Sequence, residues 1–260
     1  MKTLVRDGVR LAYEEAGSGE QPLLLVHGWA CDHTYLAPQI KHFSRRHRVI
    51  AVDLRGHGES DKPEQDYTMA LLAGDLAWLC DQLELRRPVL VGHSMGGVVG
   101  LELLASSPGR LAAIVALDSP IVLPAHRHEQ LRRAGERLHG PGAQQAVRDL
   151  VAGMFLPTDN AARKAGIVER MSSGPPHVLT SAWEQYLACP SAAADRASEI
   201  PVPLLAIASA GGHMADLQRL RQLCPRLTLG QTVGAGHFHQ LEVPEQTNAM
   251  IERFLAVSVP

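Results

Sequence analysis

The segment Pro88-Val-Leu-Val-Gly-His-Ser-Met-Gly-Gly-Val-Val-Gly100 contains the most informative motif of the sequence. Its apolar start predicts a strand, Gly92–Gly96 forms a Gly-x-Ser-x-Gly turn, and the residues that follow predict a helix. A serine on such a turn has a strained backbone, and its hydroxyl stands clear of the sheet. Glycines flank the serine because a Cβ on either side would collide with the neighbouring strand or helix. The context therefore favours Ser94 as a nucleophile over an ordinary serine in a glycine-rich turn.

Composition limits the classes of protein to consider. The chain has 260 residues, of which 45% are hydrophobic, which suits one large α/β domain with an insertion. A formal net charge of −2 and an aromatic content of 4% argue against nucleic-acid or membrane partners, so we expect a small-molecule substrate. The amino terminus has no signal-peptide pattern, and no apolar run approaches the roughly 18 residues of a membrane span.

The cysteines point to a reducing compartment. Four cysteines lie far apart without a Cys-x-x-Cys pair, so they predict free thiols rather than a disulfide framework: Cys31, Cys80, Cys189 and Cys224. Together with the absence of a signal peptide, this pattern predicts a cytoplasmic protein.

Strand and helix patterns alternate along most of the chain. A hairpin is expected around Asp7-Gly8. Further strands are expected at Leu23–His27, Arg48–Asp53, Val89–Gly92, Leu111–Asp118, Leu204–Ala208 and Leu227–Val233. Helices are expected at Tyr35–Phe43, Met69–Leu83, Met95–Ser107, Asp216–Leu223 and Gln246–Ala256. This alternation predicts a parallel sheet with right-handed crossovers.

The alternation stops after Asp118. Helical patterns separated by Gly-Pro, Pro-Thr-Asp and Gly-Pro-Pro breakers follow instead, at Glu129–Leu138, Ala143–Phe155, Ala161–Met171 and Val178–Leu187. We therefore expect a core of residues 1–122 and 198–260, with a helical cap at residues 123–197 inserted into it.

The order of these motifs resembles the α/β-hydrolase fold over nearly the whole chain. The resemblance rests on His27-Gly-Trp29, Asp53-Leu-Arg-Gly-His-Gly-Glu-Ser60, Gly92-His-Ser-Met-Gly96 and Gly234-Ala-Gly-His237, in that order. It implies a mostly parallel eight-stranded sheet flanked by helices, with a helical cap after the sixth strand. It also implies a general base at His237, late in the chain, in preference to its neighbour His239.

The resemblance also suggests an oxyanion hole. The Met95 N–H lies at the amino end of the helix after Ser94, where the helix dipole favours a developing negative charge. In the enzymes that this chain resembles, the residue after His-Gly supplies the second N–H donor, which is Trp29 here.

The acid that would complete a triad has two candidates. Its usual position in this fold follows the seventh strand, but Gly211 and Gly212 stand there, and Asp216 comes later where it can cap a helix. Asp118 ends the sixth strand, which is the position of the acid in some lactonases, dehalogenases and cofactor-free dioxygenases of this fold. We favour Asp118, and Asp53 is expected to brace the loop after its strand.

The cap should form the roof of the substrate pocket. Apolar candidates for the lining are Trp29, Met154, Phe155, Met171, Leu179, Trp183 and Leu187, although any one of them can simply pack cap against core. Four arginines make the first cap helix basic, and a solvated helix face is expected for them: Arg127, Arg132, Arg133 and Arg137. No metal site or cofactor fingerprint stands out.

These residues predict a serine hydrolase that cleaves a small ester, lactone or thioester through an acyl-enzyme on Ser94, with His237 and Asp118. A second hypothesis is a cofactor-independent dioxygenase of a hydroxyquinolone, with the His237–Asp118 pair as base. It follows from the similarity of His27-Gly-Trp-Ala-Cys-Asp-His33 to the corresponding stretch of those enzymes. A third is a non-catalytic ligand-binding member of the fold.

Overall fold

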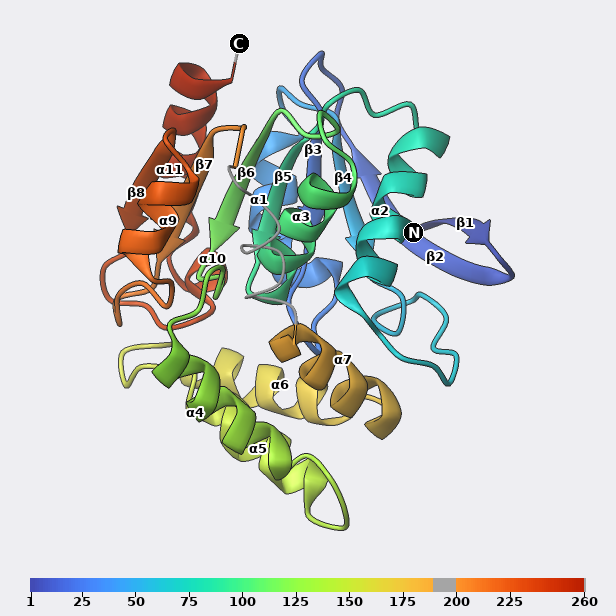
Figure 1. Ribbon diagram of the computed structural model, residues 1–260, viewed down its shortest axis with the longest axis vertical. Helices are drawn as coiled ribbons and strands as arrows, with labels where there is room; N and C mark the ends of the chain where they lie inside the picture. The colour runs from blue at the N-terminus through green and yellow to red at the C-terminus, as the bar shows by residue number, and fades with distance from the viewer. Residues whose placement is uncertain (189–199, 260) are drawn as a thin grey trace.

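The computed structural model describes residues 1–188 and 200–259 and contains one eight-stranded sheet (Figure 1). The strand order is β1-β2-β4-β3-β5-β6-β7-β8. The strands are β1 (Lys2–Arg6), β2 (Val9–Ala16), β3 (Leu23–Val26), β4 (Val49–Asp53), β5 (Val89–His93), β6 (Ala113–Leu117), β7 (Leu204–Ala208) and β8 (Leu227–Gln231). Strands β1, β2 and β4 pair antiparallel and all other neighbours pair parallel, which confirms the predicted fold class.

Helices cover both faces of the sheet, and alternate strand residues point to opposite faces. Leu23, Leu25, Val89 and Val91 pack with α1 (Ala37–Phe43) and α11 (Pro244–Ser258). Leu24, Val26 and Leu90 pack toward α2 (Met69–Gln82), α3 (Met95–Ser106) and α9 (Leu217–Leu223). Because every residue of β3 and β5 is buried, these strands read as continuous apolar runs.

Among the described residues between β6 and β7, four helices form the cap: α4 (Ala125–Glu136), α5 (Ala143–Ala152), α6 (Ala161–Ser172) and α7 (Pro176–Ala188). They lie together beyond the end of the sheet where the parallel strands finish (Figure 1). The predicted carboxyl-terminal boundary of the cap, at residues 197 and 198, lies outside the described residues.

Several predicted helix ends differ from the structure. The expected helix Tyr35–Phe43 begins with a short 3-10 helix, η1 (His33–Leu36), because Pro38 can only occupy the first turn of α1. Helix α5 ends at Ala152 rather than Phe155, and a short helix, α10 (His239–Glu242), was not expected. Strand β8 ends at Gln231 rather than Val233.

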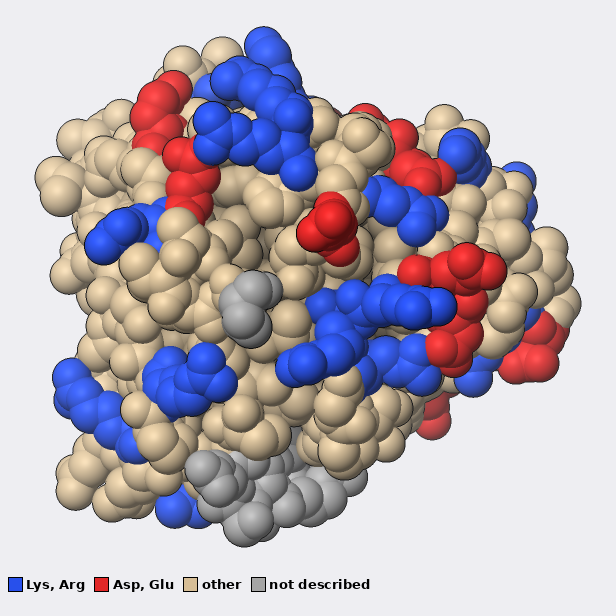
Figure 2. Space-filling view, turned by 90° about the horizontal axis from the view of Figure 1, so that it is seen from above, with Lys and Arg blue, Asp and Glu red and all other residues tan. Residues whose placement is uncertain are grey.

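The end of the molecule away from the cap carries both basic and acidic side chains (Figure 2).

Cys31 and Cys80 are buried free thiols, whereas the Cys224 Sγ lies 3.8 Å from the Val202 carbonyl oxygen. Cys189 lies outside the described residues. None of the described helices has the length and apolar character needed to cross a membrane.

Candidate functional site

Ser94 lies on a sharp turn between β5 and α3. Its backbone has φ 51° and ψ −120°, which is a strained conformation for any residue except glycine. The flanking glycines make the turn possible. A Cβ on Gly92 would lie 2.5 Å from the Gly96 carbonyl carbon, and one on Gly96 would lie 2.2 Å from the Val26 carbonyl oxygen. The close approach of the helix to the sheet therefore requires Gly-x-Ser-x-Gly.

Asp118 follows the last residue of β6 and contacts His237 directly. The His237 Nδ1 donates a hydrogen bond to Asp118 Oδ2 at 2.7 Å, and the Ser209 N–H donates to Oδ1 at 3.0 Å. Burial raises the pKa of the Asp118 carboxyl, but the hydrogen bonds from His237 and Ser209 outweigh it and hold the pKa below its usual value. The carboxylate is therefore ionised and orients the imidazole.

The rival candidates have other contacts. Asp216 is the N-cap of α9, where its Oδ1 accepts the Arg219 N–H at 2.9 Å. The His239 ring is fully buried, and its Nδ1 lies 3.0 Å from the Thr247 hydroxyl. Burial lowers the pKa of His239 to about 4, which suits a neutral ring in the core.

The His237 backbone is held from both sides. Its N–H donates to the Met154 carbonyl at 2.9 Å, and its own carbonyl oxygen lies 3.1 Å from His93 Nε2. His93 precedes Ser94, and its ring centroid lies 4.7 Å from that of His237. The loop Gly234–His237, called the histidine loop, is thus bonded to the Ser94 turn (the elbow) on one side and to the cap on the other.

The loop after β3 lies against Ser94. A Cβ on Gly28 would lie 3.0 Å from the Ser94 Cβ, a tight contact that would require one of the two segments to shift slightly. The backbone N–H groups of Trp29 and Met95 donate no hydrogen bond to any other described residue. Trp29 follows Gly28 on the loop beside Ser94, and Met95 is the first residue of α3, so both predicted donors belong to segments next to Ser94.

Trp29 also connects core and cap through its side chain. Its Nε1–H donates to the Leu179 carbonyl of α7 at 2.8 Å, and its ring meets Trp183 edge-on at a centroid distance of 4.8 Å. The ring of Trp29 therefore joins the core to α7 of the cap.

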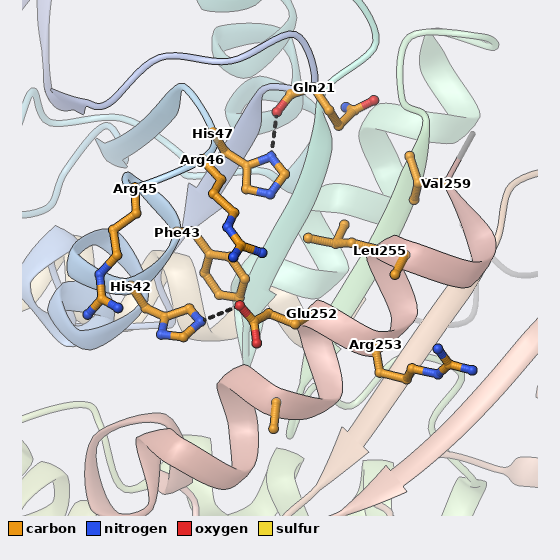
Figure 3. A pocket seen from close by; sticks show the side chains of 12 residues that line it. Gln21, His42, Phe43, Arg45, Arg46, His47, Glu252, Arg253, Leu255 and Val259 are labelled. Carbon is orange, nitrogen blue, oxygen red and sulfur yellow. Dashed lines mark hydrogen bonds and ion pairs between the residues drawn. The ribbon is translucent and has the colours of Figure 1, made fainter.

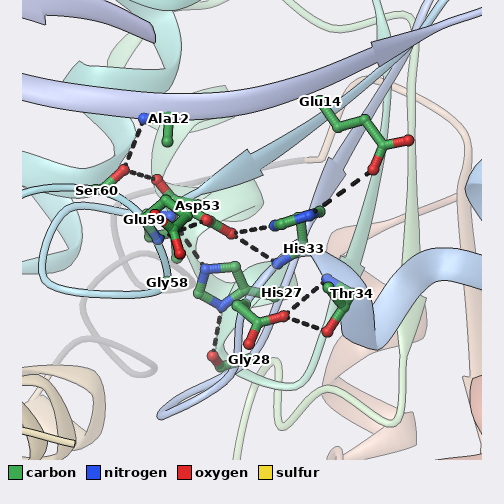
Figure 4. A network of polar contacts seen from close by, with 12 residues as sticks. Ala12, Glu14, His27, Gly28, His33, Thr34, Asp53, Gly58, Glu59 and Ser60 are labelled. Atoms are coloured by element: carbon green, nitrogen blue, oxygen red, sulfur yellow. Dashed lines mark hydrogen bonds and ion pairs between the residues drawn. The ribbon is translucent and has the colours of Figure 1, made fainter. Parts of the chain in front are cut away.

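A buried polar network stabilises the loop after β3 (Figure 4). Asp53 is fully buried, and its Oδ1 accepts the backbone N–H of His33 at 2.7 Å and its ring Nδ1–H at 2.8 Å. Its Oδ2 accepts the Glu59 N–H at 2.8 Å. The Leu54 N–H donates to His27 Nε2 at 3.0 Å. These bonds join the loops after β3 and β4.

Ser94, Asp118 and His237 line one cavity of about 520 Å³ between core and cap. Of the predicted apolar lining, Trp29, Met154, Phe155, Met171 and Trp183 border this cavity. Leu179 and Leu187 do not border it; their carbonyl groups accept hydrogen bonds from Trp29 and His128.

Sequence reasoning missed other lining residues. Cys31, Tyr186, Met214 and Phe238 line the cavity without a local pattern that separates them from core residues. Arg127 also lines it, although a solvated helix face was expected. The other arginines of that stretch, Arg132, Arg133 and Arg137, pair with Glu129, Glu136 and Asp149.

A larger cavity of about 610 Å³ lies on the face of the sheet that α1 and α11 cover (Figure 3). Arg45, Arg46 and Arg253 line its rim, and His42 pairs with Glu252 at 2.9 Å. None of the candidate site residues borders this cavity, so it is not the candidate active site. Among the described residues, no group of three or more His, Cys, Asp or Glu side chains could hold a metal ion.

Comparison with known proteins agrees with this geometry. The family model described as "alpha/beta hydrolase fold" matches residues 21–244. The chain is 29% identical over 248 residues to a protein of Caulobacter sp. (strain K31) named "Putative carbamate hydrolase RutD", and the match covers 92% of each chain. Three other curated relatives match only in part, over 57%, 30% and 33% of their own length.

Solved structures show the same architecture. A thermophilic esterase from Thermogutta terrifontis superimposes with a TM-score of 0.85 at 26% identity, covering 99% of this chain and 97% of that one. Est816, described as an N-acyl homoserine lactone degrading enzyme, gives a TM-score of 0.83 at 26% identity, covering 97% of this chain and 100% of that one. Because the family model spans most of the chain and the sheet, elbow and cap accompany it, this chain belongs to the alpha/beta hydrolase fold family.

Proposed function

We propose that this protein is a serine hydrolase that cleaves a small carboxylic ester, lactone or thioester. The observation that carries the proposal is the ionised Asp118 bonded to His237 Nδ1, in the same cavity as the strained Ser94. Because Nδ1 carries the hydrogen and is engaged, Nε2 is the ring nitrogen left to accept the serine proton.

The first half of the reaction forms an acyl-enzyme. The Ser94 Oγ attacks the carbonyl carbon of the substrate while His237 Nε2 accepts the hydroxyl proton. Asp118 stabilises the imidazolium that results, and the N–H groups of Trp29 and Met95 stabilise the oxyanion. The tetrahedral intermediate then expels the alcohol or thiol, which takes the proton from Nε2.

The second half releases the acid. Water gives a proton to His237 Nε2 as its oxygen attacks the acyl carbon, and the same two N–H groups hold the second oxyanion. Collapse of this intermediate returns the proton to Ser94 Oγ and frees the carboxylic acid. The Ser94 hydroxyl makes no hydrogen bond to another described residue, so its hydrogen bond to His237 Nε2 would form when substrate binds.

The structural relatives and the cavity support this choice of substrate class. The Thermogutta terrifontis protein is named an esterase, and Est816 is described as degrading a lactone. The cavity of about 520 Å³ suits a small molecule, and its apolar walls suit an acyl chain or ring.

The contacts of Asp32 and His33 speak for hydrolysis over cofactor-free oxygenation. Asp32 caps η1, His33 is bonded to Asp53, and neither residue borders the cavity. Asp32 and His33 belong to the His27–His33 stretch that resembles the dioxygenases. Here they stabilise the loop after β3 and do not contact substrate.

Labelling with a fluorophosphonate, followed by peptide mapping, tests the proposal. We expect an adduct on Ser94 in the wild type, none in Ser94→Ala, and hydrolysis of p-nitrophenyl acetate by the wild type alone. A folded wild type that takes no label and hydrolyses no ester would refute it. Oxygen uptake with a hydroxyquinolone would then point to the dioxygenase, and tight ligand binding without turnover to a binding protein.

A further inference from the structure

The segment between α5 and α6 contacts the loop that carries His237. We call residues 154–160 the strap. Its first three residues, Met154, Phe155 and Leu156, line the candidate active-site cavity. Of its remaining residues, Thr158 and Asp159 form hydrogen bonds with the Gly234–His237 loop. The strap is therefore in contact with both the substrate cavity and the histidine loop.

Asp159 makes the central contact of the strap. Its residue is only 9% exposed, and its Oδ1 accepts the Gly236 N–H at 3.1 Å while Oδ2 accepts the Leu156 N–H at 2.7 Å. A buried carboxylate is costly unless several donors satisfy it, and bonds from N–H groups to an ionised acceptor are among the stronger hydrogen bonds. One carboxylate thus orders the strap and holds the residue that precedes His237.

The next residue is held by the same segment. The His237 N–H donates to the Met154 carbonyl at 2.9 Å, so both successive amides of the histidine loop bond to the strap. The approach is so close that a Cβ on Gly236 would lie 2.6 Å from that carbonyl oxygen and 2.7 Å from Asp159 Oδ2. The second glycine of Gly-x-Gly-His therefore makes room for the cap.

A carboxylate of the core also accepts a hydrogen bond from the strap. Glu242, which belongs to α10 of the core, accepts the Asn160 N–H at 3.1 Å and pairs with Arg163 of α6 at 2.7 Å. The Thr158 hydroxyl donates to the Gly234 carbonyl at 3.1 Å. A carboxylate of the cap thus accepts a core N–H before His237, and a carboxylate of the core that follows His237 accepts a cap N–H.

We propose that Asp159 is a positioning residue that sets the orientation of His237 according to the position of the cap. Substrate that packs against Met154 and Phe155 presses on the segment whose carbonyl and carboxylate hold the backbone of His237. A well-fitting acyl group would therefore improve the geometry of proton transfer as well as its own binding. This inference rests on the proposed function of His237 as the general base.

Steady-state kinetics and nuclear magnetic resonance test the proposal together. The variants are Asp159→Ala, Asp159→Asn and the control Glu169→Gln, which removes an exposed carboxylate of α6 that pairs with Arg148. Kinetics use p-nitrophenyl acetate and butyrate at temperatures well below each unfolding midpoint. Proton spectra follow the low-field signal of the His237 Nδ1–H, assigned by its loss in Asp118→Asn.

In both Asp159 variants we expect kcat to fall about 10- to 100-fold, with KM changed less than about threefold, because misplacement of a catalytic group by about 1 Å costs this much. The low-field signal should shift or broaden in step with kcat. Asp159→Asn keeps the side-chain volume and carries the test if Asp159→Ala does not fold. Glu169→Gln should behave as the wild type.

Two results would overturn the proposal. One is a kcat within about twofold of the control in a folded Asp159 variant, and the other is an unchanged Nδ1–H signal. If the wild type shows neither esterase activity nor a Ser94 adduct, the proposed function fails. The spectra would still report whether Asp159 holds His237, so the two failures can be told apart.

Discussion

His237 Nδ1 lies 2.7 Å from Asp118 Oδ2, although the two residues are 119 positions apart in the chain. Asp118 follows β6 directly, and its N–H donates to the Ile207 carbonyl of β7 at 2.8 Å. The backbone there has φ 42°, which turns the chain out of the strand as it leaves the sheet. Parallel pairing of β6 with β7 therefore brings the carboxylate to the edge where the histidine loop passes.

Exchange of this carboxylate for an amide should remove most of the activity. We expect Asp118→Asn to lower kcat by about three to four orders of magnitude, because an amide favours the wrong tautomer of the imidazole. Asp216→Asn should leave kcat within about twofold and change stability little, because asparagine also caps helices well. Hydrolysis of p-nitrophenyl acetate measures both effects, and the opposite ranking would move the acid to Asp216.

The strained backbone of Ser94 should be visible in stability. We expect Ser94→Gly to be about 1 kcal/mol more stable than Ser94→Ala, because glycine adopts φ 51° with little strain. Both variants should be inactive. Urea unfolding measures the difference in the free energy of unfolding.

Ala105→Gly, on an exposed position of α3, is the matched control for the strain. Glycine in a helix of ordinary geometry should cost about 1 kcal/mol. If Ser94→Gly is also less stable than Ser94→Ala, the turn stores no strain and the prediction fails.

The indole of Trp29 should affect binding more than chemistry. Trp29→Phe removes the hydrogen bond to the Leu179 carbonyl, which is worth about 1 kcal/mol, and weakens the packing against Trp183. We expect KM to rise severalfold while kcat changes less, because the backbone N–H is retained. Trp78→Phe, on α2 and outside the cavity, should alter neither constant. A loss confined to kcat would contradict this division between ring and backbone.

The His33–Asp53 pair should make stability depend on pH. The hydrogen bond to Asp53 raises the pKa of His33 above its ordinary value of 6.5, against the effect of partial burial. A raised folded-state pKa means that the stabilisation is fully present below pH 6.5 and is lost as pH rises through the folded pKa.

The measurement compares wild type with His33→Gln in urea at about pH 6 and about pH 9. We expect the difference in the free energy of unfolding to be larger at the lower pH. A difference that is the same at both values, or larger at the higher one, would show that a neutral His33 braces Asp53 equally well.

Much of the fold could be predicted from local patterns. Leu204–Ala208 is a strand with the predicted bounds, because a strand buried on both faces must be apolar throughout. Gly92 and Gly96 predicted the elbow because no other residue fits against the strand and the helix. The end of α5 was predicted poorly: the helix ends at Ala152, and the Met154 carbonyl beyond it accepts the His237 N–H, a contact that helical periodicity does not reveal.

Local patterns predicted the order of the strands and of most helices, and the turn at Ser94, because each depends on residues close together in the chain. The histidine loop was predicted from the resemblance to a known fold. The tertiary structure was needed to show that Asp118 contacts His237 while Asp216 caps α9. It alone showed that Asp159 holds Gly236. These contacts depend on the register of β6 against β7 and on the position of the cap on the core. Both follow from packing between segments that are far apart in the sequence.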